Sequence, residues 1–171
     1  VGRIESAIEA TSAITSSSLR LRLENLARIY QWQTRLGDVD GMMATAESIL
    51  DLRPGMKPYV DSQQYLKLLT GFEMEPVLDD LRNAPASVEE NPSPGRAVIR
   101  ALAAFRCGDR AASGEWAATV DPARLPAGQR AVLAGLLAEA GAAADGIRIA
   151  EKIPSGSLLP DERWFLAAAM R

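Results

Sequence analysis

Apolar and polar positions do not alternate for long anywhere along the chain, which argues against β-strands. Alanine, the best helix former, occurs 29 times, whereas the β-branched residues Val, Ile and Thr together occur 23 times. We therefore expect an all-α protein of helices and turns. The expected helices span 3–15, 19–36, 38–52, 56–70, 73–83, 94–107, 109–120, 126–140, 142–153 and 160–171.

Glycines and prolines mark the helix boundaries at regular intervals. Glycine supplies the left-handed residue that closes a helix, and the expected ends are Gly37, Gly71, Gly108 and Gly141. Proline is tolerated in the first helical turn, and the expected starts are Pro58, Pro94 (after Ser93, a good N-cap), Pro126 and Pro160. The glycines are 34, 37 and 33 residues apart and the prolines 36, 32 and 34. The two series predict a period of about 34 residues.

A second set of prolines follows the glycines and is expected to end the shorter helix of each unit, because the residue before proline disfavours helix. Its members are Pro54, Pro85, Pro122 and Pro154. Short loops between consecutive helices predict antiparallel hairpins. The chain then forms a single helical-repeat domain over 1–171. It begins with a leading helix in 1–18, continues with repeats 19–55, 56–93, 94–125 and 126–159, and ends with 160–171 as the first helix of an incomplete repeat.

This two-helix unit resembles the tetratricopeptide repeat over 19–171. Leu36-Gly37-Asp38 resembles the turn between the two helices of that repeat. Other residues near the family pattern are Leu26, Ile29, Tyr30, Pro54, Ala101 and Ala134. Residues that depart from it are Gln33, Lys67, Pro76 and Ala104. The resemblance implies degenerate repeats stacked as a right-handed α-solenoid of antiparallel helix hairpins with a concave surface, and another helical-hairpin array also fits the period.

The resemblance also implies where a partner would bind. In that family the first helices line the concave surface, which makes candidate groove residues of Gln31, Arg35, Tyr65, Arg106 and Glu139. The leading hypothesis is a non-catalytic protein–protein interaction module that binds a peptide or protein partner. Arginines in the groove suit an acidic or C-terminal carboxylate ligand. The alternative is a structural or regulatory segment of a larger protein that contacts its own flanking domains or self-associates.

The last expected helix, 160–171, carries more apolar surface than a solvent-facing terminal repeat should show. Its large apolar side chains are Trp164, Phe165, Leu166 and Met170. We expect the edge formed by Trp164 and Phe165 to contact a further helix of a longer array or a second copy of the chain.

The composition of the 171 residues argues against an enzyme. Histidine is absent, which excludes Ser-His-Asp and Cys-His catalysis and histidine zinc sites. The single cysteine, Cys107, cannot form a multi-thiolate metal site, and no glycine-rich phosphate loop is present. Asp38-Val39-Asp40-Gly41 lacks the further acids of a calcium loop, so Asp38 and Asp40 are interpreted as helix-start residues. We therefore expect no metal and no cofactor.

The charge and hydropathy of the chain limit the classes of partner that we expect. The chain has 22 acidic and 19 basic residues, a net charge of −3, so no nucleic-acid partner is expected and RNA binding by helical repeats is disfavoured. No stretch approaches the roughly 18 apolar residues of a membrane span, so no direct insertion is expected. A start at Val1 rather than Met suggests a processed or excised fragment. An upstream anchor or signal is compatible with such a start, and a cytoplasmic location is slightly favoured.

Overall fold

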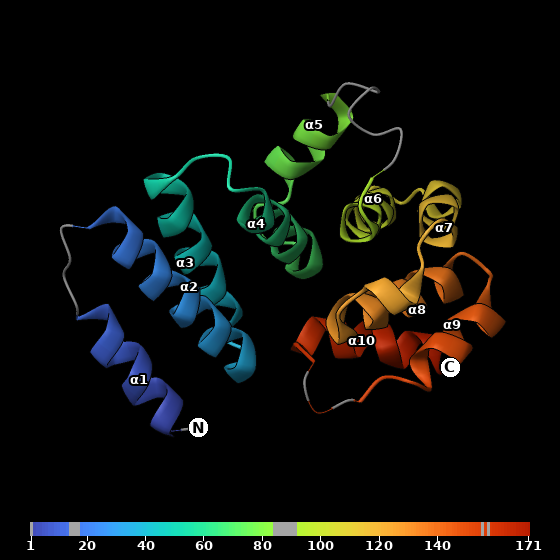
Figure 1. Cartoon of the computed structure of the whole chain (residues 1–171). Coiled ribbons are helices and arrows are strands. Elements are labelled where there is room, and N and C mark those ends of the chain that lie inside the picture. Colours follow the sequence, from blue (N-terminus) through green and yellow to red (C-terminus); the bar gives the residue numbers. More distant parts are fainter. Residues whose placement is uncertain (1, 14–17, 84–91, 155, 157) are drawn as a thin grey trace. The chain divides into compact units, whose positions relative to one another are not determined.

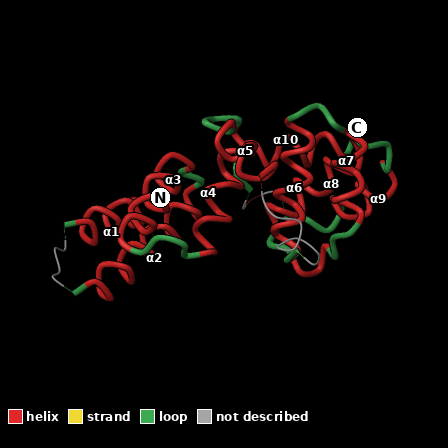
Figure 2. The backbone as a smooth tube through the Cα atoms, turned by 90° about the horizontal axis from the view of Figure 1, so that it is seen from above, coloured by secondary structure: helices red, strands yellow, loops and turns green. Residues whose placement is uncertain are grey.

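A computed structural model describes residues 2–13, 18–83, 92–154, 156 and 158–171. All regular secondary structure in these residues is helical, which confirms the all-α class (Figure 1 and Figure 2). The α-helices are α1 (Gly2–Ser12), α2 (Leu19–Leu36), α3 (Val39–Leu52), α4 (Lys57–Thr70), α5 (Glu75–Asn83), α6 (Pro94–Arg106), α7 (Arg110–Ala118), α8 (Ala127–Glu139), α9 (Ala143–Ala150) and α10 (Pro160–Ala169). A short 3₁₀ helix, η2 (Pro122–Arg124), lies between α7 and α8.

The glycine markers are confirmed. Each of the four follows the end of a helix and has a positive φ, between 72° at Gly37 and 93° at Gly141. A side chain with a Cβ is strained in this region, so glycine lets the chain reverse direction at low cost. Pro94 and Pro160 are the first residues of α6 and α10, whereas Pro126 lies one residue before α8. Pro85 lies outside the described residues.

Most helices are shorter at their ends than the sequence predicts, and the backbone explains the difference at α5 and α9. We expected a helix from residue 73, but Glu73 has a φ of 47°, which is incompatible with a right-handed helix, and α5 begins at Glu75. The helix expected over 142–153 ends at Ala150. Beyond it the Lys152 and Ile153 amides donate to carbonyls three residues earlier, so the last turn tightens into 3₁₀ geometry.

The described residues form two compact units, Val1–Leu66 and Lys67–Arg171. In the first unit α2 packs against α1 and α3. In the second, α6 packs against α7, and α8 packs against α6, α7, α9 and α10. The solenoid arrangement, the 34-residue period and the repeat boundaries stay predictions.

The core of the first unit includes residues of α2 and α3 and contains a buried polar contact. Ile29 and Ile49 are buried, and the Thr45 hydroxyl donates to the Gln33 side-chain carbonyl at 2.9 Å. This bond explains why the glutamine is tolerated at a core position. Asp38 is the N-cap of α3, since its carboxylate accepts from the Gly41 amide at 3.0 Å, as the helix-start interpretation requires.

The second unit is built around α8. Its residues 131–137 are all buried, since helices pack against it on several sides (Figure 1). Glycines make the closest approaches. A Cβ on Gly135 would lie 2.6 Å from the Phe165 carbonyl oxygen of α10, and one on Gly146 of α9 would lie 2.7 Å from the Ala134 carbonyl oxygen. Backbone therefore packs directly on backbone around α8.

A buried hydroxyl in α7 provides a stability test. Ser113 is 1% exposed, and its Oγ has no hydrogen-bond partner. An unpaired buried hydroxyl destabilises the folded state, and serine is also a poorer helix former than alanine. We expect Ser113→Ala to raise the free energy of unfolding by about 1 kcal/mol, measured by urea unfolding followed by circular dichroism.

The matched control is Ser48→Ala. Ser48 is exposed in the middle of α3, and its hydroxyl donates to the Ala44 carbonyl at 2.9 Å. Ser48→Ala gains the same helix propensity but does not remove a buried, unpaired hydroxyl. A Ser113→Ala change no more stabilising than Ser48→Ala would show that the Ser113 hydroxyl costs nothing in the native unit.

Candidate interaction sites

The five residues expected to line a concave surface have different surroundings. Gln31 and Arg35 are exposed and lie one turn apart on α2. Tyr65 is 6% exposed on α4, so its side chain offers little surface to a partner. These three belong to the first unit, and Arg106 and Glu139 belong to the second.

Arg106 is occupied within the fold. It is half-buried at the end of α6, and its Nε donates to the Leu68 carbonyl at 2.7 Å. Its Nη2 donates to the Leu69 carbonyl. Burial lowers the pKa of the Arg106 guanidinium, and the charge of Asp161 opposes that shift. The guanidinium therefore covers the open carbonyls at the C-terminal end of α4, where the helix dipole also favours a cation.

Glu139 also has an internal partner. Its carboxylate lies 3.2 Å from Nη2 of Arg110, in an ion pair that joins the end of α8 to the start of α7. The Arg110 side chain is 63% exposed, so water screens the pair. Of the five candidates, Gln31 and Arg35 present the most open surface.

The two expected edge residues, Trp164 and Phe165, differ in exposure. Phe165 is 1% exposed and lies against Gly135, with its ring 5.6 Å from the ring of Phe105. It therefore belongs to the core of the second unit. Trp164 is 49% exposed and places its ring edge-on to Phe165, at 4.9 Å between centroids. Trp164 is thus the member of the pair that offers surface.

An open groove of about 640 Å³ lies between the start of α2, the end of α3 and the start of α4. We call it the α2–α4 groove. Its apolar lining consists of Leu19, Leu23, Ala27, Ile49, Met56 and Tyr59, and its charged lining consists of Arg20, Glu24 and Arg53. The Arg20 Nε lies 2.8 Å from the Glu24 carboxylate. The exposed Arg53 side chain has no hydrogen bond or ion pair with the described residues.

Tyr59 lines one side of the α2–α4 groove and packs against Tyr30, which is not part of the lining. The ring of Tyr59 stands edge-on to that of Tyr30, at 5.5 Å between centroids and 89° between planes. The Tyr30 hydroxyl shares a hydrogen bond with Ser62, which ties α2 to α4. Burial raises the pKa of both tyrosines, so both are neutral at physiological pH. The groove therefore has an uncharged aromatic side, and the contact with Tyr30 holds the Tyr59 ring in position.

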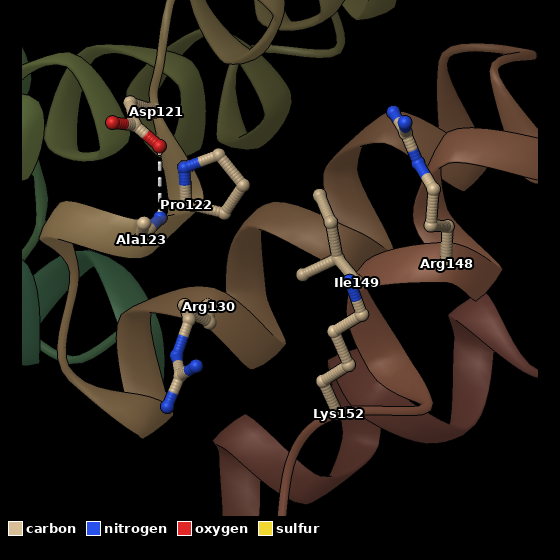
Figure 3. Close-up of a pocket in the computed structure, with 7 residues that line it drawn as sticks. All are labelled: Asp121, Pro122, Ala123, Arg130, Arg148, Ile149 and Lys152. Carbon is tan, nitrogen blue, oxygen red and sulfur yellow. Dashed lines mark hydrogen bonds between the residues drawn. The ribbon is translucent and has the colours of Figure 1, made fainter.

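A second hollow, of about 380 Å³, lies in the second unit between η2, α8 and α9 (Figure 3). We call it the basic hollow. It is lined by Asp121, Pro122, Ala123, Arg130, Arg148, Ile149 and Lys152. The sequence alone did not indicate this hollow. A usable signal was present, because Arg148 and Lys152 are four residues apart and so share one face of a helical turn.

A neighbouring hollow of about 390 Å³ shares Pro122, Arg148 and Ile149 with the basic hollow. Its remaining lining is mostly small and apolar and comes from α7, α8, α9 and the turn between α8 and α9, with Arg110 and Asp145 as its charged members. The basic hollow therefore has an adjacent, more apolar hollow beside it.

Within the described residues, no three histidine, cysteine, aspartate or glutamate side chains cluster closely enough to hold a metal ion. None of the described helices has the length and apolar character needed to cross a membrane. Comparisons of the chain with protein-family models, curated proteins and solved structures gave no match. The resemblance to tetratricopeptide repeats thus rests on the residues given above and stays a prediction.

Proposed function

We propose that this chain is a non-catalytic interaction module that binds a peptide or protein partner, and that the α2–α4 groove holds an apolar side chain of that partner. The observation that carries the proposal is the groove itself, whose 640 Å³ falls in the size range of ligand sites and whose lining is mainly apolar. Leu19, at one end, is 49% exposed. Covering the exposed half of this side chain contributes roughly 1 kcal/mol to binding.

The charges of the groove specify the partner further. Arg20 is already paired with Glu24, whereas Arg53 has no acidic partner among the described residues. A carboxylate beside the apolar anchor of the partner would pair with Arg53 through charge-assisted hydrogen bonds. The proposed ligand is therefore a segment with a large apolar residue next to an acidic one.

Two of the three helices that line the groove are expected first helices. α2 and α4 are the first helices of the expected repeats 19–55 and 56–93, the helices that line the concave surface in the family the chain resembles. Gln31 and Arg35 lie further along α2, on its exposed surface. They extend the proposed binding surface beyond the groove.

Selection from a peptide display library tests the proposal. We expect the wild-type chain to enrich peptides with an apolar–acidic pair. Ala27→Trp should weaken the selected peptides at least about tenfold, because the indole fills the space of the anchor. Arg53→Glu should shift the selected sequences from acidic to basic residues beside the anchor.

Ala44→Trp is the matched control, since Ala44 is exposed on α3 and does not line the groove. It adds the same side chain to the same unit and should leave affinity within about twofold. Circular dichroism verifies that each variant is folded. Arg53 is exposed, so Arg53→Glu remains informative if Ala27→Trp misfolds. Enrichment of the same peptides at the same affinity by wild type and Arg53→Glu would refute the groove as the binding site.

A further inference from the structure

The basic hollow gathers positive charge on a chain whose net charge is −3. Its lining carries three cations, Arg130, Arg148 and Lys152, and one carboxylate, Asp121 (Figure 3). Like charges in one hollow repel one another, and an anionic ligand removes that repulsion. The local charge is thus opposite in sign to that of the whole chain.

Two of the three cations of the basic hollow have no acidic partner among the described residues. The Asp121 carboxylate accepts from the Ala123 amide at 2.9 Å and so caps η2. Arg148 lies 2.7 Å from Asp145, in a pair whose side chains are both more than half exposed and therefore contribute little. Arg130 and Lys152 form no ion pair with the described residues.

Arg130 carries a donor that the fold leaves unsatisfied. Its Nε is buried and has no hydrogen-bond partner, although such a group normally has one. In Figure 3 the guanidinium groups of Arg130 and Arg148 point away from each other, so the cations border the hollow from different sides. A ligand that reaches both sides must therefore carry more than one acidic group or extend along the hollow.

The apolar part of the lining favours a peptide ligand over a simple anion. Pro122 and Ile149 lie in both hollows, and the neighbouring hollow continues along the small residues of α7. A free inorganic anion gains nothing from such walls, whereas a peptide buries aliphatic groups against them. Both hollows together therefore suit an extended ligand with alternating acidic and apolar groups.

We infer that the basic hollow and its neighbour bind an acidic peptide segment, with an aliphatic side chain against Pro122 and Ile149 and carboxylates on Arg130 and Lys152. This site lies in the second unit and selects for acidic charge. It is therefore independent of the α2–α4 groove, which is mainly apolar and belongs to the first unit.

Fluorescence anisotropy with a labelled peptide of alternating glutamate and leucine tests the inference. We expect the full chain to bind this probe, and to bind it more weakly as sodium chloride screens the charges. A matching peptide with lysine in place of glutamate should not bind. Lys152→Glu and Arg130→Gln should each weaken the acidic probe about tenfold, the effect of losing one charge-assisted contact.

Arg171→Glu is the matched control, since Arg171 is exposed, lies outside both hollows and undergoes the same change of charge as Lys152→Glu. It should change affinity less than about twofold. Lys152 is exposed, so its variant tests the site even if Arg130→Gln fails to fold. The probe also contains the apolar–acidic pair proposed for the α2–α4 groove. All variants are therefore compared in an Arg53→Glu background, which keeps the test separate from that of the first groove.

Three results would overturn the inference. One is equal binding of the acidic probe by wild type and Lys152→Glu. Another is equal loss of binding in Lys152→Glu and Arg171→Glu, which would indicate attraction to the overall charge alone. The third is competition by inorganic phosphate beyond that of sodium chloride at equal ionic strength, which would identify a site for simple anions.

Discussion

Replacing Gly135 by alanine should destabilise the second unit by about 2 kcal/mol, although alanine is the better helix former by about 1 kcal/mol. The added Cβ would lie 2.6 Å from the Phe165 carbonyl oxygen and 2.9 Å from the Phe165 Cβ. Both atoms belong to α10 close to its backbone, so a rotamer change cannot relieve the contact. The two helices must move apart, which costs more than the gain in helix propensity. Gly135→Val should be worse, because its branched side chain needs still more space.

Urea unfolding followed by circular dichroism measures this loss, and Gly95→Ala is the matched control. Gly95 lies in α6 of the same unit, and its added Cβ would meet only the end of the Gln129 side chain, at 3.3 Å. That side chain can move aside, so we expect a small change or a gain in stability. If Gly135→Ala were as stable as wild type, α8 and α10 would have to lie further apart than the structure shows.

Arg106→Gln should lower the free energy of unfolding by about 2–3 kcal/mol, because two charge-assisted hydrogen bonds to main-chain carbonyls are lost in a half-buried place. The Leu68 and Leu69 carbonyls at the end of α4 would lose their cationic donor. Arg106→Lys should lie between wild type and Arg106→Gln, because lysine keeps the charge but lacks the two-pronged donor. Urea titrations of the three proteins give the comparison.

Arg124→Gln serves as the control for the lost charge. Arg124 is exposed on η2 in the same unit, and its side chain has no hydrogen bond with the described residues. Its replacement should change stability by less than about 0.5 kcal/mol. Equal effects of Arg106→Gln and Arg124→Gln would show that the contacts to α4 do not support the fold. In either case Arg106 is a poor residue for testing partner binding.

Helix positions could be predicted from the sequence because their boundaries depend on local chemistry. A glycine with positive φ at Gly37 or a serine cap at Ser93 acts on its own turn, and the structure confirms both. Tertiary packing is not encoded in this way. Arg106 lies on an expected first helix, yet nothing in its neighbourhood along the chain indicates that it contacts the end of α4. Phe165 is likewise buried where it packs against a glycine of α8.

The candidate sites were harder to predict than the helices. The α2–α4 groove combines residues from three helices, and Tyr59 lies there because Tyr30 and Ser62 hold α4 against α2. The basic hollow needs Arg130 from α8 beside Lys152 from the turn after α9. Residue spacing within one helix could have indicated Arg148 and Lys152. Bringing Arg130 to the same hollow required the packing of α8 on α9.

The burial of α8 has a consequence for how the chain opens. Neighbouring helices enclose its amides, and they approach it closely at glycines. We therefore expect the amide hydrogens of α8 to exchange with solvent only when the whole second unit unfolds. α1, in contrast, has no buried residue, and its amides should exchange through local fraying. Protection of the backbone amides against hydrogen exchange is thus expected to be lowest in α1 and highest in α8.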